Sequence, residues 1–292
     1  MYSFPIIWTM FGIDSVSMDT LGKWCCLAVV LTSVYRLLYQ DVQMEWEKDY
    51  NMGAAYELLP NVFITVNYAF QAKKKIIPIF CSVVGVFYLF AMGTRGPLVV
   101  VFAFVFMRYL LYIIENNASK KFITFLVFIG VVGFFISSHF LELLEWLGGV
   151  LSSMGLSTRI IDFVVAEEFI SDTSSRDMIY DSLIKKMDTL PFFGYGVLGE
   201  NRFDFLSAHN IYIQAIFDYG FVFGTLILLF LTTISIKSLI KTKGSLSQQW
   251  LMIWIVFVFV RGIYGGGVLR FETFMLIGCC LRVLRMKTYD IQ

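Results

Sequence analysis

The chain has 292 residues, of which 58% are hydrophobic and 15% are charged, and its net charge is +1. Soluble domains are about half apolar and about one quarter charged, so this composition, with a mean hydropathy of +0.73, excludes a water-soluble globule. We therefore expect an all-α integral membrane protein. The net charge carries no information about nucleic acid, because the charges are sorted by membrane side, and we expect no nucleic-acid partner.

Residues 1–23 form a short N-terminal stub. Its apolar stretch, 2–13, is too short to cross a membrane and lacks the basic start of a signal peptide. We interpret the stub either as the remnant of a missing helix, in a truncated chain, or as an interfacial segment.

Eight apolar runs follow, and each is long enough, or nearly so, to cross about 30 Å of hydrocarbon. They cover 24–39, 54–70, 76–92, 97–114, 122–137, 211–236, 249–264 and 268–284. We predict about eight transmembrane helices, the first five within 24–137 and the last three within 209–284. Gly265 to Gly267 would form a tight turn between the last two.

Basic residues lie at alternate junctions of these runs. They gather at 73–75, 120–121, 237–243 and 282–287. Short loops rich in lysine and arginine stay in the cytoplasm, so we place these junctions and the tail 285–292 inside. The polar segment 138–208 then becomes one large extracytoplasmic loop of a protein in the cytoplasmic membrane.

The large loop contains a predicted amphipathic helix. Ser174 and Asp177 are placed as its cap, and an apolar stripe of helical period follows at Met178, Ile179, Leu183, Ile184 and Met187. The run 190–196 ends this helix. Its Gly194 and Gly196 let the backbone approach a ligand or another helix closely.

Arg176 lies in the first turn of that predicted helix. The amides of a first turn are electropositive and favour acidic neighbours, so a guanidinium there is locally unfavourable but suits a phosphate group. The alternative is that Arg176 pairs with Asp172 or Tyr180 on a solvated face. Arg159 is a further candidate contact for a diphosphate.

Arg95 lies at the outer end of two predicted spans, where positive charge is depleted. Arg36, Arg261 and Arg270 also occur in apolar runs toward the outer side. Charge in a membrane usually lines a cavity or has a partner, and the planar fork of arginine suits a diphosphate. The alternative is snorkelling to lipid headgroups, which we expect for Arg108 near the inner end.

His209 and Asn210 open the sixth run at the predicted outer interface. An imidazole can accept a proton from a sugar hydroxyl near neutral pH, and Asn210 could orient it or hold a hydroxyl. The alternative for His209 is an interfacial cap. Farther along, Gly220 and Gly224 are spaced as a small-residue face for close helix packing.

Metal and cofactor motifs are lacking in the sequence. The acids of the loop are scattered, and there is no Asp-x-Asp pair and no glycine-rich phosphate loop followed by lysine. We expect neither a metal nor another cofactor.

The order of these motifs resembles the O-antigen polymerase and ligase superfamily of the Wzy type. The shared features are the runs 51–60 and 93–97, Arg176 in a large outer loop, Gly194 to Gly196, and 209–212 followed by Gly220. The resemblance covers 51–292. Members of the family are usually longer, with additional spans before the matched region.

The resemblance implies a metal-independent membrane glycosyltransferase acting on undecaprenyl-diphosphate-linked oligosaccharide at the outer face. Arg176 and Arg95 would hold the diphosphate, with Arg159, Asn210, Gly194 and Gly196 as further contacts, and His209 would assist the attacking hydroxyl. A second lipid-linked repeat unit as acceptor gives a polymerase of O-antigen or capsule. The implied partners are membrane lipids, a chain-length regulator and a flippase.

Two alternatives remain open at this stage. With a lipid A core sugar as acceptor, the same chemistry gives an O-antigen ligase. Arginines in an outer vestibule also suit a transporter or flippase of lipid-linked oligosaccharide, although such a protein should carry polar groups at the bilayer midplane and inverted repeats. A purely structural membrane subunit is a third interpretation.

Overall fold

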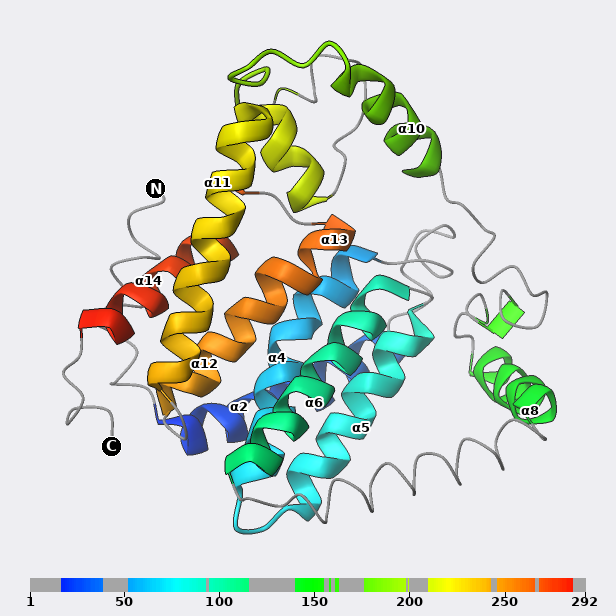
Figure 1. The fold of residues 1–292 in the computed structure, drawn as a ribbon. Coiled ribbons are helices and arrows are strands. Elements are labelled where there is room, and N and C mark those ends of the chain that lie inside the picture. Colours follow the sequence, from blue (N-terminus) through cyan, green and yellow to red (C-terminus); the bar gives the residue numbers. More distant parts are fainter. Residues whose placement is uncertain are drawn as a thin grey trace. The chain divides into compact units, whose positions relative to one another are not determined.

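The computed structural model of the chain describes residues 17–38, 52–92, 95–115, 140–154, 158, 161–162, 176–197, 199, 210–242, 246–265 and 268–285 (Figure 1). Within these ranges the fold is helical and contains no strand, in agreement with the predicted all-α class. The chain divides into two compact units, Met18–Asp172 and Thr173–Gln292 together with Met1–Ser17. Each unit is described by itself.

The unit Met18–Asp172 is built from helices at four of the predicted apolar runs. They are α2 (Met18–Leu38), α4 (Met52–Gln71), α5 (Ile76–Ala91) and α6 (Arg95–Glu115), and α8 (Phe140–Ser153) follows them. α2, α4 and α5 pack on one another, and α6 packs on α4 and α5. The run 122–137 lies outside the described residues.

The core of this unit is apolar and closely packed. Phe63 of α4 stacks on Phe104 of α6 with ring centroids 4.3 Å apart. Gly85 of α5 lies against the side chains of Val62 and Val29, where a Cβ would approach Val62 to 2.8 Å. Small residues at such contacts let membrane helices approach closely.

Two polar groups of this unit are held by partners. Arg108 is buried rather than snorkelling as expected, since its Nε donates to Asn67 Oδ1 at 3.1 Å and its guanidinium lies 5.3 Å from the centre of the Phe70 ring. An internal partner offsets the unfavourable burial of the charge. Near the start of α2, Lys23 donates to Asp19, and this bond lowers the pKa of the Asp19 carboxyl.

The unit Thr173–Gln292 contains α10 (Arg176–Met187), α11 (Ile211–Lys241), α12 (Leu246–Ile255), the π-helical turn η4 (Val256–Val260), α13 (Gly262–Gly265) and α14 (Phe271–Arg285). α11 packs on α12, α13 and α14, and α12 packs on α14. Leu251, Met252, Val256 and Leu276 lie at the centre of these contacts and are fully buried.

Two helices of the described part of the chain are long and apolar enough to cross a membrane. They are Gly96–Ile113, within α6, and α11, and each has a mean hydropathy of 2.0. Ile76–Ala91 and Ser247–Val260 are shorter apolar helices. These elements support the assignment of the chain to a membrane.

Candidate functional site

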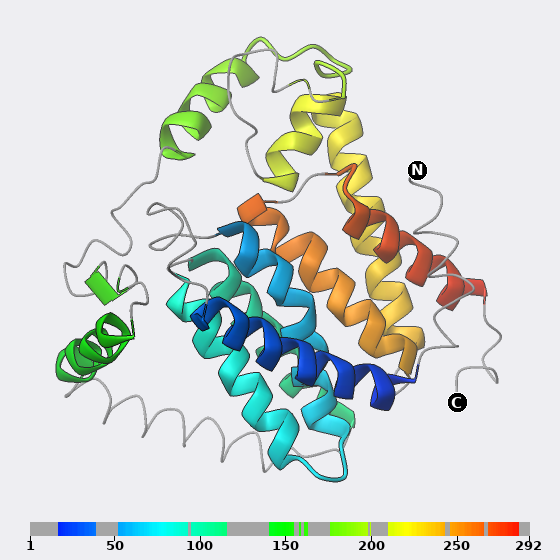
Figure 2. The same cartoon turned by 180° about the vertical axis from the view of Figure 1, so that it is seen from behind.

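α11 consists of two helical arms joined at Gly220. Gly220 has φ 78° and ψ 165°, in the left-handed half of backbone space that glycine favours. The chain reverses there. A Cβ added to Gly224 would lie 2.3 Å from the carbonyl oxygen of Ala215, a distance that residues nine positions apart in one straight helix could not reach. Figures 1 and 2 both show the short arm, 211–219, beside the long arm, 221–241.

We predicted one continuous span over 211–236, and the reversal at Gly220 divides this segment into two arms. The long arm is about 30 Å long at 1.5 Å per residue, which matches the hydrocarbon thickness of a bilayer. The short arm covers about 14 Å and is too short to cross. Gly220 is therefore the turn between the two arms. Gly224, on the long arm, makes the close contact expected of a small residue, and its neighbour in that contact is the short arm.

A loop formed by residues 190–197 and 199 docks onto the turn of this hairpin, and we call it the docking loop. Tyr195 N donates to Phe217 O at 2.8 Å, Gly196 N donates to Asp218 O at 3.0 Å, and Gly199 N donates to the Asp218 carboxylate at 2.9 Å. The last carbonyls of a helix have no partner within the helix, so the loop amides complete the end of the short arm.

Glycines make this docking possible. Gly194 has φ 72° and Gly196 has φ 87°. A Cβ on Gly194 would lie 2.4 Å from Gly220 N, and a Cβ on Gly220 would lie 2.0 Å from Phe192 O. The close backbone approach predicted for Gly194 is therefore observed, and its neighbour is a helix turn. Contact of Gly194 and Gly196 with a substrate stays a prediction.

Asp218 is expected to hold the docking loop in place. Its side chain is buried, with 2% exposed, and accepts the bond from Gly199 N. Asp218→Ala should leave a buried donor unsatisfied, at about 1–3 kcal/mol, and so speed proteolytic cleavage within 190–199. Asp218→Asn keeps an acceptor oxygen and should be cleaved more slowly than the alanine variant. Equal cleavage rates for the wild type and Asp218→Ala would contradict this role.

α10 packs on the short arm through its predicted apolar stripe. Leu183 and Phe217 are fully buried against each other, with Ile179, Met187 and Ile213 around them. Ile184 was expected in the same stripe, but its side chain is 56% exposed. Arg176 is the first residue of α10, two positions after the predicted cap at Ser174.

The start of α11 is fixed by polar contacts. Asn210 caps the helix, its Oδ1 accepting from Tyr212 N at 3.0 Å and Ile213 N at 3.3 Å. The Tyr212 hydroxyl donates to Phe259 O at 3.0 Å, and Ile211 lies against Gly262. The side-chain oxygen of Asn210 thus has a structural role, and its predicted contact with substrate stays a prediction.

An ion pair lies beside this start. Arg261 bonds to Glu272, and the guanidinium of Arg261 lies 5.5 Å from the centre of the Phe257 ring in the π-helical turn. Both residues line a small cavity with Ile211 and Arg270. Arg261, which the sequence analysis placed in an apolar run, therefore has the partner expected of such a charge, and the sequence alone did not identify Glu272 as that partner.

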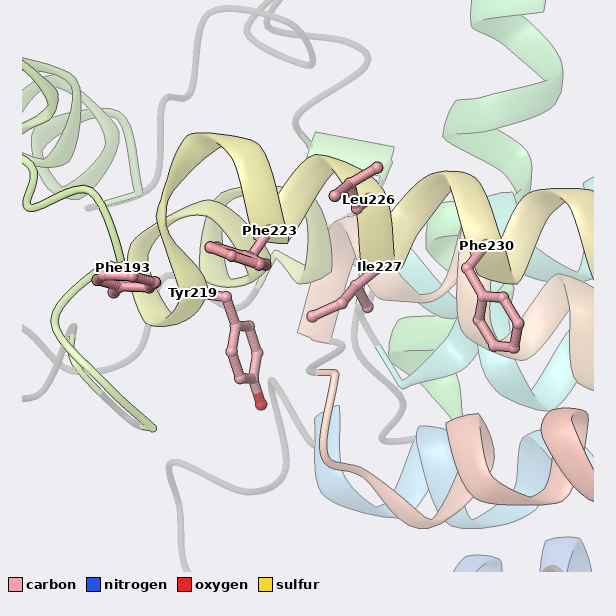
Figure 3. Close-up of a pocket in the computed structure, with 6 residues that line it drawn as sticks. All are labelled: Phe193, Tyr219, Phe223, Leu226, Ile227 and Phe230. Atoms are coloured by element: carbon pink, nitrogen blue, oxygen red, sulfur yellow. The ribbon is translucent and has the colours of Figure 1, made fainter.

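An open apolar groove of about 470 Å³ runs from the docking loop along the long arm (Figure 3). It is lined by Phe193, Tyr219, Phe223, Leu226, Ile227 and Phe230. Phe193 and Phe223 stack with ring centroids 5.4 Å apart, so the loop and the long arm together form its outer end. Residues 223, 226, 227 and 230 are spaced so that they share one face of a helix. The same spacing occurs on any helix face that packs against protein, so it does not by itself predict a groove.

The predicted site residues are only partly brought together by the structure. Gly194, Gly196, Asn210 and the backbone of Arg176 lie in the unit Thr173–Gln292. Arg95 begins α6 in the other unit. His209, Arg159 and the side chains of Arg176 and Arg95 lie outside the described residues.

Comparison with protein families, with curated proteins and with solved structures gives no match. Among the residues that the structure describes, no group of three or more histidine, cysteine, aspartate or glutamate side chains is placed to hold a metal ion.

Proposed function

We propose that this chain is a membrane glycosyltransferase that joins undecaprenyl-diphosphate-linked oligosaccharide repeat units into O-antigen or capsular polysaccharide. The observation that supports it is the assembly around the hairpin turn. α10, which begins at Arg176, packs on the short arm, and the docking loop is bonded to the end of that arm. α10 and the glycine-containing docking loop thus both contact the short arm, and Phe193 of the docking loop also lines an apolar groove on the long arm, which is long enough to cross a membrane.

In the proposed reaction, a sugar hydroxyl of the acceptor attacks the anomeric carbon of the donor. The bond from that carbon to the diphosphate oxygen breaks, and its electron pair leaves with the diphosphate. Arg176 and Arg95, with Arg159, stabilise the developing negative charge. His209 takes the proton of the attacking hydroxyl. Ligation to a lipid A core sugar would use the same steps with a different acceptor.

A transporter of lipid-linked oligosaccharide is the second candidate, and the broken helix α11 favours it, because transporters bind substrates at interrupted helices. In such sites the unwound carbonyls coordinate the coupling ion. Here the carbonyls of Phe217 and Asp218 accept bonds from Tyr195 N and Gly196 N. Their engagement favours the glycosyltransferase.

The proposed membrane arrangement has about eight spans, with 138–208 outside and 237–243 inside. Cysteines introduced at Ser171 and Ser245 should therefore differ in labelling by an impermeant maleimide added to intact cells. We expect Ser171→Cys to react and Ser245→Cys to react only after permeabilisation. The five native cysteines are buried and give a low background. The opposite labelling pattern would contradict the arrangement.

The polymerase itself is tested in a strain that lacks its own polymerase but makes the matching repeat unit. Expression of this chain should restore a ladder of polymer lengths on a gel. A single repeat transferred to the core, without a ladder, would indicate a ligase instead. Accumulation of the lipid-linked unit on the inner leaflet in the absence of the chain would indicate the transporter.

A further inference from the structure

One apolar face of α8 packs at the end of α5. Leu144 and Leu151 of α8 share a buried cluster with Ala91, and Phe87 and Phe90 pack against that cluster. The three α5 residues all lie at the C-terminal end of that helix. The cluster therefore holds α8 at the end of α5 and not along its length.

The opposite end of α5 is marked by lysines. Three exposed lysines, at 73–75, come directly before Ile76, the first residue of α5. The 16 residues of α5 cover about 24 Å, and the hydrocarbon core of a bilayer is about 30 Å thick. In the proposed membrane arrangement the lysines lie at one membrane surface, so the end of α5 that carries α8 lies close to the other surface.

α8 runs across the direction of α5. Figures 1 and 2 both show α8 foreshortened, nearly along its axis, whereas α5 is seen from the side. The 14 residues of α8 cover about 21 Å, which is too short to cross the hydrocarbon core. A short helix that crosses the end of a membrane span lies along the membrane surface.

The remaining surface of α8 is divided between a polar face and an apolar strip. Four exposed residues share the polar face at helical spacing: Glu142, Glu145, Gly149 and Ser152. Trp146 and Val150, four positions apart, lie between this face and the one packed at α5. The Trp146 side chain is 65% exposed. Tryptophan is enriched at membrane surfaces, because its ring is apolar and its N–H is polar.

We infer that α8 lies in the lipid headgroup region of the membrane surface opposite the lysines at 73–75, and that Trp146 anchors it there. The inference rests on the proposed membrane arrangement and makes the bilayer itself the partner of this face. Helices of this kind usually bear lysine or arginine on the polar face, whereas α8 bears Glu142 and Glu145. The anchor therefore depends on burial of apolar side chains and not on attraction to anionic lipid.

Spin labels on two neighbouring residues of the full chain test the inference. Glu145→Cys and Trp146→Cys are each labelled with a nitroxide in phosphatidylcholine nanodiscs, and the two side chains point about 100° apart. Relaxation by oxygen, which concentrates in lipid, is compared with relaxation by a water-soluble nickel chelate. We expect the ratio of oxygen to nickel accessibility to be several-fold higher at 146 than at 145. Addition of phosphatidylglycerol should leave both ratios unchanged.

Two controls keep the test sharp. The unsubstituted chain, treated in the same way, measures the background from the five buried native cysteines. Tryptophan fluorescence examines the anchor without a label, since the emission of the wild type minus that of Trp146→Phe isolates Trp146. Lipid brominated near the headgroup end of its acyl chain should quench this difference more strongly than lipid brominated near the chain end.

Four results would overturn the inference. Equal ratios at 145 and 146, both favouring the nickel chelate, would place this part of α8 in water. Low accessibility of the label at 146 to both reagents would show that protein covers Trp146. Stronger quenching by the deeper bromine would place Trp146 in the hydrocarbon core. A ratio at 146 that rises with phosphatidylglycerol would show that charge holds the helix.

The spin-label contrast requires no turnover and does not depend on which membrane surface faces the cytoplasm. A negative ladder experiment with the expected contrast would therefore reject the polymerase and retain the anchor. Reversed labelling of Ser171→Cys and Ser245→Cys with the same contrast would reject the proposed sidedness, and α8 would still lie at the surface opposite the lysines.

Discussion

Gly220→Ala is expected to abolish the hairpin of α11 and to lower the thermal stability of the purified protein by about 10 °C, or to prevent its accumulation. Two effects act together. A φ of 78° is strained for alanine, and the added Cβ would lie 2.0 Å from Phe192 O, a backbone atom that cannot move without releasing the docking loop. Strain and lost docking bonds together should cost about 3 kcal/mol or more. Fluorescence-detected size-exclusion chromatography after heating measures the loss.

Gly149→Ala is the matched control. Gly149 lies in α8, where an added Cβ would meet nothing within 4 Å, and alanine is the better helix former. Its melting temperature should be equal to that of the wild type or slightly higher. If Gly220→Ala behaves in the same way as Gly149→Ala, α11 is a continuous helix and the docking loop does not bind to a turn within it.

Substitution of the two predicted site residues is expected to abolish polymer formation. If Arg176 binds the diphosphate through its planar fork, Arg176→Lys should retain little activity although the charge is kept. If His209 takes the proton, His209→Ala should lower turnover by about 10²-fold or more, and the wild-type rate should fall as acid protonates the imidazole. The ladder assay, with initial rates in membranes, measures both.

Protein levels must be compared by immunoblot, because a folding defect imitates a catalytic one. Lys185→Ala is a suitable control for Arg176→Lys, since Lys185 is an exposed basic residue on the same helix α10. It should leave the ladder intact. Normal ladders from both Arg176→Lys and His209→Ala at normal protein levels would remove these residues from the mechanism and favour the transporter or a structural subunit.

Hydrophobic runs predicted the positions of the helices well. α5 begins and ends within one residue of the predicted run 76–92, and α10 packs through Ile179, Leu183 and Met187 of its predicted stripe, although Ile184 of that stripe is exposed. Such features follow from local sequence, because a long apolar run must bury its length in lipid or protein.

The hairpin in α11 was not predicted, because the short arm is rich in apolar residues and follows the same helical pattern as the span after it. Hydropathy records how apolar a segment is but not whether the chain reverses. Gly220 alone marks the turn, and its spacing from Gly224 fits ordinary helix packing equally well. The groove was missed for a related reason, since it needs Phe193 from the docking loop as well as one face of the long arm.

The short length of the first arm also constrains how the protein is assembled. Insertion machinery recognises apolar segments of about twenty residues, and about nine residues precede Gly220 in α11. In the proposed membrane arrangement the long arm would be the segment that is inserted, and the short arm would fold back onto it afterwards. The docking loop, whose amides bond to the end of the short arm, can take its place only after that step. In the proposed arrangement the hairpin would add one crossing rather than two, and the C-terminus would stay on its predicted side.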